Sequence, residues 1–154
     1  MVRVAVVDYG LGNLFSVCRA CEHAGLVATI TGAPDDLAAA DAVVLPGVGA
    51  FADDGRKVPQ VGWSAITPPE GVDWAGTVLE GAVGTQVYFV HSYYVRPADP
   101  SVVFSESRFG PLVFCSSVRR ANVFGCQFHP ERSASQGLAI YRNMARLLTD
   151  GGCW

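Results

Sequence analysis

Residues 4–13 read VAVVDYGLGN, a continuous apolar run followed by a turn that contains two glycines. The run Val4–Val7 has no polar residue, which is typical of a parallel strand buried on both faces. After the turn, Leu14–Ala24 is expected to be helical, with Asn13 as its N-cap and Gly25 at its C-terminal end. The stretch therefore predicts a strand, a tight turn and a helix.

Two further strands are expected after this helix. Val27–Thr31 is the second strand, Pro34–Ala40 a short helical turn and Ala42–Leu45 a third buried strand. Such an alternation of strands and helices predicts a parallel sheet with helices on its faces.

The alternation is interrupted after residue 49. A further parallel strand needs a crossover of about a dozen residues, which is usually helical. Residues 50–57 read AFADDGRK, which is too short and too polar to cover a sheet. No linker is evident there, so we expect one domain over residues 1–154 with a discontinuity near residues 53–57.

The second half of the chain has the alternation of antiparallel strands. Gln86–Arg96 is the most regular example, and its apolar face is expected to comprise Val87, Phe89, His91, Tyr93 and Val95. Turn residues divide four shorter expected strands: Val102–Ser105, Leu112–Ser116, Ser117–Arg120 and Val123–Phe128.

The last expected element is a helix at roughly Ser135–Leu148. Its apolar stripe comprises Leu138, Tyr141, Met144 or Ala145, and Leu148. The predicted fold class is therefore α/β, a parallel sheet with an antiparallel extension.

Composition excludes several classes of protein. A chain of 154 residues with 50% hydrophobic and 16% charged residues is not typical of disorder. A net charge of −3 argues against a strongly basic nucleic-acid binder. No apolar run approaches the roughly 18 residues of a membrane span, and the N-terminal residues lack the pattern of a signal peptide. We therefore expect a soluble cytoplasmic protein.

The five cysteines are irregularly spaced, unlike those of a disulfide framework. Cys18 and Cys21 form a Cys-x-x-Cys motif, for which zinc binding and redox chemistry are the alternatives to simple packing. A zinc site needs two more ligands, and a redox pair usually lies at a helix N-terminus rather than in mid-helix. We therefore favour buried helix packing, and expect neither a metal nor a cofactor.

Residues 125–131, GCQFHPE, are the most specific candidate for catalysis. His129 follows an expected strand, and ligands of open α/β sheets bind at the carboxyl ends of the strands. Glu131 is close enough in the chain to orient the imidazole, as in a nucleophilic triad. The alternative is a structural histidine beside a glutamate.

Two glycine-containing turns are further candidates. Residues 46–49, PGVG, follow a buried strand, so their amides are candidates for an oxyanion hole, and a plain strand-to-loop turn is the alternative. Residues 9–13 resemble the start of a dinucleotide-binding fingerprint, but Phe15 occupies the position of the third glycine. In the aromatic stretch Tyr88–Tyr94, His91 and Ser92 are expected to face opposite sides.

Five motifs in order resemble the family of glutamine amidotransferase subunits of imidazole glycerol phosphate synthase, over residues 2–148. They are residues 6–14 (VVDYGLGNL), 45–51 (LPGVGAF), 57–63 (KVPQVGW), 88–94 (YFVHSYY) and 125–133 (GCQFHPERS). The resemblance implies a flavodoxin-like class I amidotransferase fold. It also implies hydrolysis of L-glutamine, with the ammonia passed to a barrel-shaped cyclase (synthase) partner in histidine biosynthesis.

The resemblance also assigns roles to residues of this chain. The catalytic base and its orienting carboxylate are His129 and Glu131, and the oxyanion loop includes Gly47, Val48 and Gly49. The residues that contact the substrate glutamine are His91, Ser92 and Tyr93. Asn13 and Trp63 lie in segments that resemble the partner-facing surface.

One part of the family pattern is missing. The nucleophile of the family is a cysteine in a Gly-x-Cys-x-Gly elbow, which is expected between Phe51 and Lys57 and does not occur in this sequence. The resemblance therefore implies a deletion of about 50 residues, given typical domain sizes. Cys126 is nearest to His129, but strand alternation would point the two to opposite faces.

We therefore expect a chain that keeps the base and binding elements of a glutaminase without its nucleophile. Three alternatives stay open: a non-catalytic module that docks on the synthase, a small flavodoxin-like ligand-binding protein, and the product of a damaged reading frame. Loss of a central strand is also expected to expose the apolar faces of Ala42–Leu45, which favours low stability or association.

Overall fold

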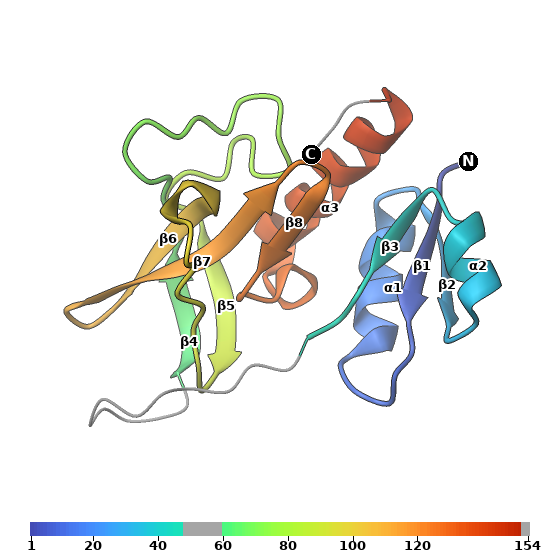
Figure 1. Ribbon diagram of the computed structural model, residues 1–154, viewed down its shortest axis with the longest axis horizontal. Helices are drawn as coiled ribbons and strands as arrows, with labels where there is room; N and C mark the ends of the chain where they lie inside the picture. The colour runs from blue at the N-terminus through green and yellow to red at the C-terminus, as the bar shows by residue number, and fades with distance from the viewer. Residues whose placement is uncertain (48–59, 152–154) are drawn as a thin grey trace.

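The computed structural model describes residues 1–47 and 60–151. Its N-terminal half is a βαβαβ unit: β1 (Arg3–Val7), α1 (Leu14–His23), β2 (Val27–Thr31), α2 (Pro34–Ala39) and β3 (Ala42–Val44). The three strands form a parallel sheet in the order β2-β1-β3 (Figure 1). This confirms the predicted parallel sheet, and only the element ends differ from expectation.

Both predicted ends of α1 are confirmed. The Oδ1 atom of Asn13 accepts a hydrogen bond from the backbone N–H of Ser16 at 3.3 Å, which satisfies one of the free amides of the first turn. Gly25 has a φ of +83°, a left-handed conformation that suits glycine after a helix. The buried face of the helix, including Val17 and Cys21, packs against Val4 and Val6 of β1.

The second half contains two antiparallel sheets. The first pairs β4 (Gln60–Ala65) with β5 (Gln86–His91). The second has the order β6-β7-β8, comprising β6 (Val103–Phe109), β7 (Leu112–Arg120) and β8 (Val123–Cys126). The remaining elements are two short 3-10 helices, η1 (Pro100–Val102) and η2 (Pro130–Arg132), and the final helix α3 (Ala134–Thr149).

Some predicted strand limits were wrong. Val87, Phe89 and His91 do lie on the buried face of β5, but the strand ends at His91, and Tyr93 and Val95 are about half exposed. The chain turns at this point, where the ring Nδ1 of His91 is 3.0 Å from the carbonyl oxygen of Tyr93.

Three further strand predictions need correction. Leu112–Ser116 and Ser117–Arg120 are one continuous strand, β7, since serines in a buried strand do not mark a turn. The strand predicted at Val123–Phe128 ends at Cys126. β4 was missed because Gly62, which has a φ of +146°, weakens the sequence signal of a strand.

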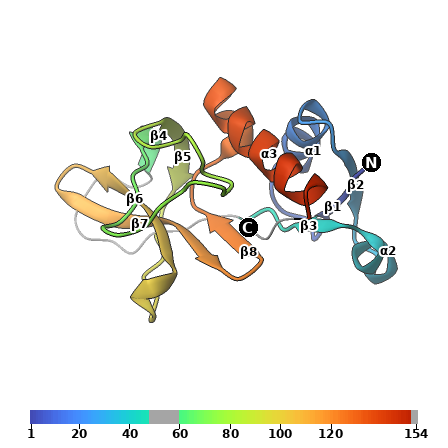
Figure 2. The same cartoon turned by 90° about the horizontal axis from the view of Figure 1, so that it is seen from above.

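α3 joins the two halves. Its predicted stripe is confirmed, since Leu138, Tyr141, Ala145 and Leu148 pack toward α1 and β1. A second face, which the sequence did not indicate, places Ile140 and Leu147 in the core of the antiparallel half. α3 and α1 lie on the same side of the parallel sheet, with α2 on the other side (Figure 2).

β3 lies at an edge of the parallel sheet as far as the described residues extend. Its Val43 side chain is 51% exposed, and Leu45, just beyond the strand, is 68% exposed. The expected exposure of apolar groups here is therefore confirmed. The predicted discontinuity near residues 53–57 falls outside the described residues, and none of the described helices has the length and apolar content to cross a membrane.

Candidate active site

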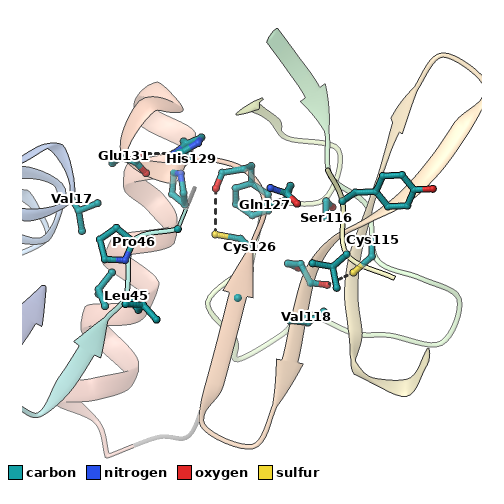
Figure 3. A pocket seen from close by; sticks show the side chains of 18 of the residues that line it. Val17, Leu45, Pro46, Cys115, Ser116, Val118, Cys126, Gln127, His129 and Glu131 are labelled. Atoms are coloured by element: carbon teal, nitrogen blue, oxygen red, sulfur yellow. Dashed lines mark hydrogen bonds and ion pairs between the residues drawn. The ribbon is translucent and has the colours of Figure 1, made fainter. Parts of the chain in front are cut away.

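A cavity of about 470 Å³ opens between the two halves of the molecule, where β3 and β8 end. One wall is formed by Val44 and the residues that follow it, as far as Gly47. The opposite wall is formed by residues 115–118 of β7 and residues 125–131 (Figure 3). The carboxyl ends of β3 and β8 therefore meet at this cavity, as ligand sites of α/β sheets do.

The predicted pair of His129 and Glu131 lies in this cavity. The Nδ1 atom of His129 is 2.9 Å from the Oε1 atom of Glu131. The imidazole is 27% exposed, whereas the glutamate side chain is only 5% exposed. Because a carboxylate only accepts hydrogen bonds, the Nδ1–H group donates and Nε2 is the nitrogen left to take up a proton. This is the arrangement of a general base and its orienting carboxylate.

The loop after β3 is held by the glycine-containing turn of residues 9–13. The hydroxyl of Tyr9 donates a hydrogen bond to the carbonyl oxygen of Pro46. Gly12 has a φ of +93°, and a Cβ atom on it would lie 2.8 Å from Cβ of Pro46. Gly12 therefore has a packing role against Pro46, and Tyr9 is a site residue that the sequence did not reveal.

The structure places only part of the predicted oxyanion loop. Gly47 lines the cavity opposite His129, whereas Val48 and Gly49 lie outside the described residues.

The predicted substrate residues are divided between the cavity and the core. Tyr93 lines the cavity, while His91 is buried in the core between Phe89 and Phe114. Burial lowers the pKa of His91, so its imidazole is neutral at pH 7. Ser92 is partly buried and is not among the residues that line the cavity.

The two predicted partner-facing residues occupy different places. Asn13 lines the cavity beside α1. Trp63 lies on β4, is 51% exposed, and meets the ring of Tyr88 edge-on with centroids 6.0 Å apart. The centroid of the Tyr88 ring is in turn 6.5 Å from that of the His129 ring, so aromatic rings connect Trp63 to the cavity.

Two cysteines line the cavity, Cys126 and Cys115. The strand argument that Cys126 and His129 face opposite sides does not apply, because β8 ends at Cys126. The Cys126 thiol donates to the carbonyl oxygen of Phe128 at 3.4 Å. Burial of the sulfur among protein atoms and, second, the Glu131 carboxylate raise the pKa of Cys126 to about 12, which opposes thiolate formation.

The Cys-x-x-Cys pair is part of the helix core. Cys18 and Cys21 are free thiols buried in α1, and burial raises the pKa of Cys21 to about 12. In the parts of the chain that the structure describes, no three histidine, cysteine or acidic side chains are arranged to hold a metal ion.

Two solved structures have a similar fold. One, from Thermoplasma acidophilum, is titled a putative GMP synthase protein and superposes with a TM-score of 0.76 at 15% identity, covering 98% of this chain and 96% of that protein. The PurLQS structure from Thermotoga maritima gives 0.72 at 16% identity, over 96% and 99% of the two chains. The fold is that of the class I glutamine amidotransferases, which agrees with a His–Glu pair at the carboxyl ends of the strands.

Sequence relatives narrow this class, although no protein-family model matches the chain. The imidazole glycerol phosphate synthase subunit HisH of Moorella thermoacetica is 31% identical over 99% of this chain and 98% of its own. The subunit of the same name from Rhodopirellula baltica is 34% identical over 92% and 96% of the two chains. The chain therefore belongs to the HisH family of imidazole glycerol phosphate synthase subunits.

The alignment with the Moorella relative also has an internal gap. It runs over 211 positions, whereas this chain has 154 residues, so the difference leaves at least 57 positions with no residue of this chain opposite them. Because 98% of the relative and 99% of this chain are aligned, these positions lie inside the alignment and not at its ends.

Proposed function

We propose that this chain acts as the glutamine-binding amidotransferase subunit of an imidazole glycerol phosphate synthase, in a heterodimer with a barrel-shaped cyclase subunit in histidine biosynthesis. Membership of the HisH family supports the assignment of the complex. The observation that carries the assignment of the site is the 2.9 Å contact between Nδ1 of His129 and Oε1 of Glu131, at the mouth of a cavity large enough for an amino acid.

The residues of the cavity have distinct roles in this proposal. His129 is the base, and Glu131 keeps its Nε2 free to accept a proton. The backbone of Gly47, Val48 and Gly49 stabilises the oxyanion that forms at the carboxamide of glutamine. Tyr93 contacts the substrate directly, with His91 and Ser92 supporting the segment that carries it.

A partner surface completes the proposal. Asn13 and Trp63 face the cyclase subunit, and the exposure of Trp63 supports this, since aromatic side chains are enriched at interfaces. A cytoplasmic location is part of the same proposal, because Cys18, Cys21, Cys115 and Cys126 are free thiols, as expected in a reducing compartment.

The chain is deficient in glutamine hydrolysis according to this proposal. The Gly-x-Cys-x-Gly elbow is absent from the sequence, so His129 has no nucleophilic thiol to deprotonate and no thioester forms. Loss of the nucleophile from a catalytic triad lowers turnover by about a million-fold. The internal gap of at least 57 positions supports a missing segment of the size that the motifs predict.

The test is a glutaminase assay of this chain with the cyclase subunit of the Moorella synthase present, with the Moorella relative as the positive control. We expect ammonia release at about a millionth of the control rate, while calorimetry detects binding of L-glutamine. His129→Ala is expected to leave this residual rate unchanged. Turnover near that of the control would overturn the proposed deficiency, and absence of glutamine binding would overturn the assignment of the cavity.

A second candidate function is a non-catalytic module that docks on the synthase. It is favoured by one observation: the elements around the cavity and the exposed Trp63 are present, whereas the nucleophile motif is absent. Calorimetric titration against the same cyclase subunit separates the two candidates, because this module would bind the cyclase without binding glutamine. Trp63→Ala is expected to weaken docking, whereas Val83→Ala, at another exposed apolar residue, is not.

A further inference from the structure

Ser133 lies directly after the short helix that carries Glu131, and its side chain is completely buried. Its Oγ atom accepts a hydrogen bond from the backbone N–H of Tyr88 at 2.9 Å and donates one to the carbonyl oxygen of His129 at 2.6 Å. The backbone N–H of His129 in turn donates to the carbonyl oxygen of Tyr88 at 2.8 Å. Three hydrogen bonds therefore join Ser133, Tyr88 and His129 into a closed ring.

The use of this hydroxyl is unusual for its position. Ser133 is the N-cap residue of α3, where a serine side chain normally accepts a hydrogen bond from an amide of the first helical turn. Here it makes no capping bond, and its hydroxyl is directed back to the His129 turn instead. Ala134, the next residue, has a φ of +50°, a left-handed conformation that is costly for alanine.

We propose that Ser133 is a positioning residue for the His129 imidazole: its buried hydroxyl ties the backbone of His129 to strand β5 and so sets the direction in which the ring enters the cavity. Both backbone polar groups of His129 are fixed by the ring of hydrogen bonds. Because Glu131 belongs to the same turn, the ring also determines the distance between the carboxylate and Nδ1. Displacements of about 1 Å at such a site are enough to impair catalysis.

That His129 needs positioning as a base rests on the proposed function, whereas its geometry is measurable without turnover. The experiment uses proton–nitrogen NMR of the imidazole groups in the full chain, which contains three histidines. The signal of His129 is assigned with His129→Gln. The variant is Ser133→Ala, and the matched control is Ser135→Ala, which removes an exposed hydroxyl two residues further along the chain, in α3.

The native chain and Ser135→Ala are expected to show an Nδ1–H resonance of His129, protected by its hydrogen bond to Glu131. In Ser133→Ala this resonance is expected to broaden or disappear, and the amide of Tyr88 to exchange about tenfold faster or more. Ser133→Cys keeps a side chain of similar size with a weaker donor, so it is expected to show an intermediate result and serves if Ser133→Ala does not fold.

An unchanged Nδ1–H resonance in a folded Ser133 variant, together with faster exchange of the Tyr88 amide, would overturn the proposal, because Ser133 would then only stabilise the fold. These outcomes are independent of glutamine binding and hydrolysis, so the proposed function and the positioning role fail separately.

Discussion

Gly137 lies so close to Pro130 that a Cβ atom on the glycine would be 1.8 Å from the carbonyl oxygen of the proline. Gly137 is in the first turn of α3, and Pro130 follows His129 directly. The helix therefore rests on the turn that carries the candidate base, and only glycine allows this approach.

This contact inverts the usual effect of a glycine in a helix. Replacing an exposed helical glycine by alanine generally stabilises a protein by about 1 kcal/mol. Gly137→Ala is instead expected to destabilise this one by about 3 kcal/mol or more, because a backbone carbonyl cannot move aside as a flexible side chain can. Urea unfolding measures the change, with Gln136→Ala as the control on the exposed face of the same turn. A stabilised Gly137→Ala would contradict the contact.

The pairing of His129 with Glu131 predicts an effect on stability as well. Glu131→Ala leaves the Nδ1–H group of a mostly buried imidazole without its acceptor, which generally costs about 1–3 kcal/mol. Glu22→Ala is the matched control, since Glu22 is exposed on α1 and its loss is expected to change stability by less than about 0.5 kcal/mol. Equal effects of the two variants on urea unfolding would show that the pair does not stabilise the fold.

Much of the fold and of the site follows from local sequence signals. The apolar run of β1, the Asn13 cap and the His129–Glu131 spacing each indicated a feature that the structure contains. Strand ends were less predictable, because β5 and β8 stop where their chain meets other elements. The contacts of Tyr9 with Pro46 and of Ser133 with Tyr88 join residues 37 and 45 positions apart, so no local pattern reveals them.

Reactivity of Cys126 tests whether another thiol replaces the missing nucleophile. Its pKa is raised to about 12 by burial of the sulfur and by Glu131, so very little thiolate is present at pH 8. We expect iodoacetamide to label Cys126 at least about tenfold more slowly at pH 8 than an unstructured cysteine peptide, since the thiolate is the reactive form. Mass spectrometry of timed samples gives the rates, and unfolding in urea is expected to remove the difference. Labelling of the folded chain at the peptide rate would revive Cys126 as a candidate nucleophile.

Stability is expected to fall in alkaline solution because of Cys21. Burial raises its pKa from 9.0 to about 12 in the folded chain, with smaller contributions from Cys18 and Glu22. The folded chain therefore keeps the proton that the unfolded chain releases above about pH 9. The contribution of Cys21 is complete below pH 9 and is lost as the pH rises toward 12, at up to about 1.4 kcal/mol per pH unit.

Urea unfolding at pH 7, 9 and 10 measures this pH dependence, and Cys21→Ala provides the comparison. The variant is expected to be less stable at pH 7 but to lose stability more gradually above pH 9. Some dependence is expected to remain, because burial also raises the pKa of Cys115, to about 11. Parallel pH profiles for the two proteins would show that Cys21 is not responsible.

The exposed edge of β3 predicts self-association. Within the described residues β3 pairs with β1 alone, and Val43 and Leu45 expose apolar side chains beside its free edge. Such edges tend to pair with another chain, and a lysine on an edge strand opposes this pairing. We expect the molecular mass from light scattering to rise with protein concentration, and Val43→Lys to reduce that rise. Val83→Lys, at an exposed valine outside the sheets, is the matched control and is expected to behave as the native chain does. A native chain that stays monomeric at all concentrations and unfolds in one sharp transition would show that this edge is not a liability.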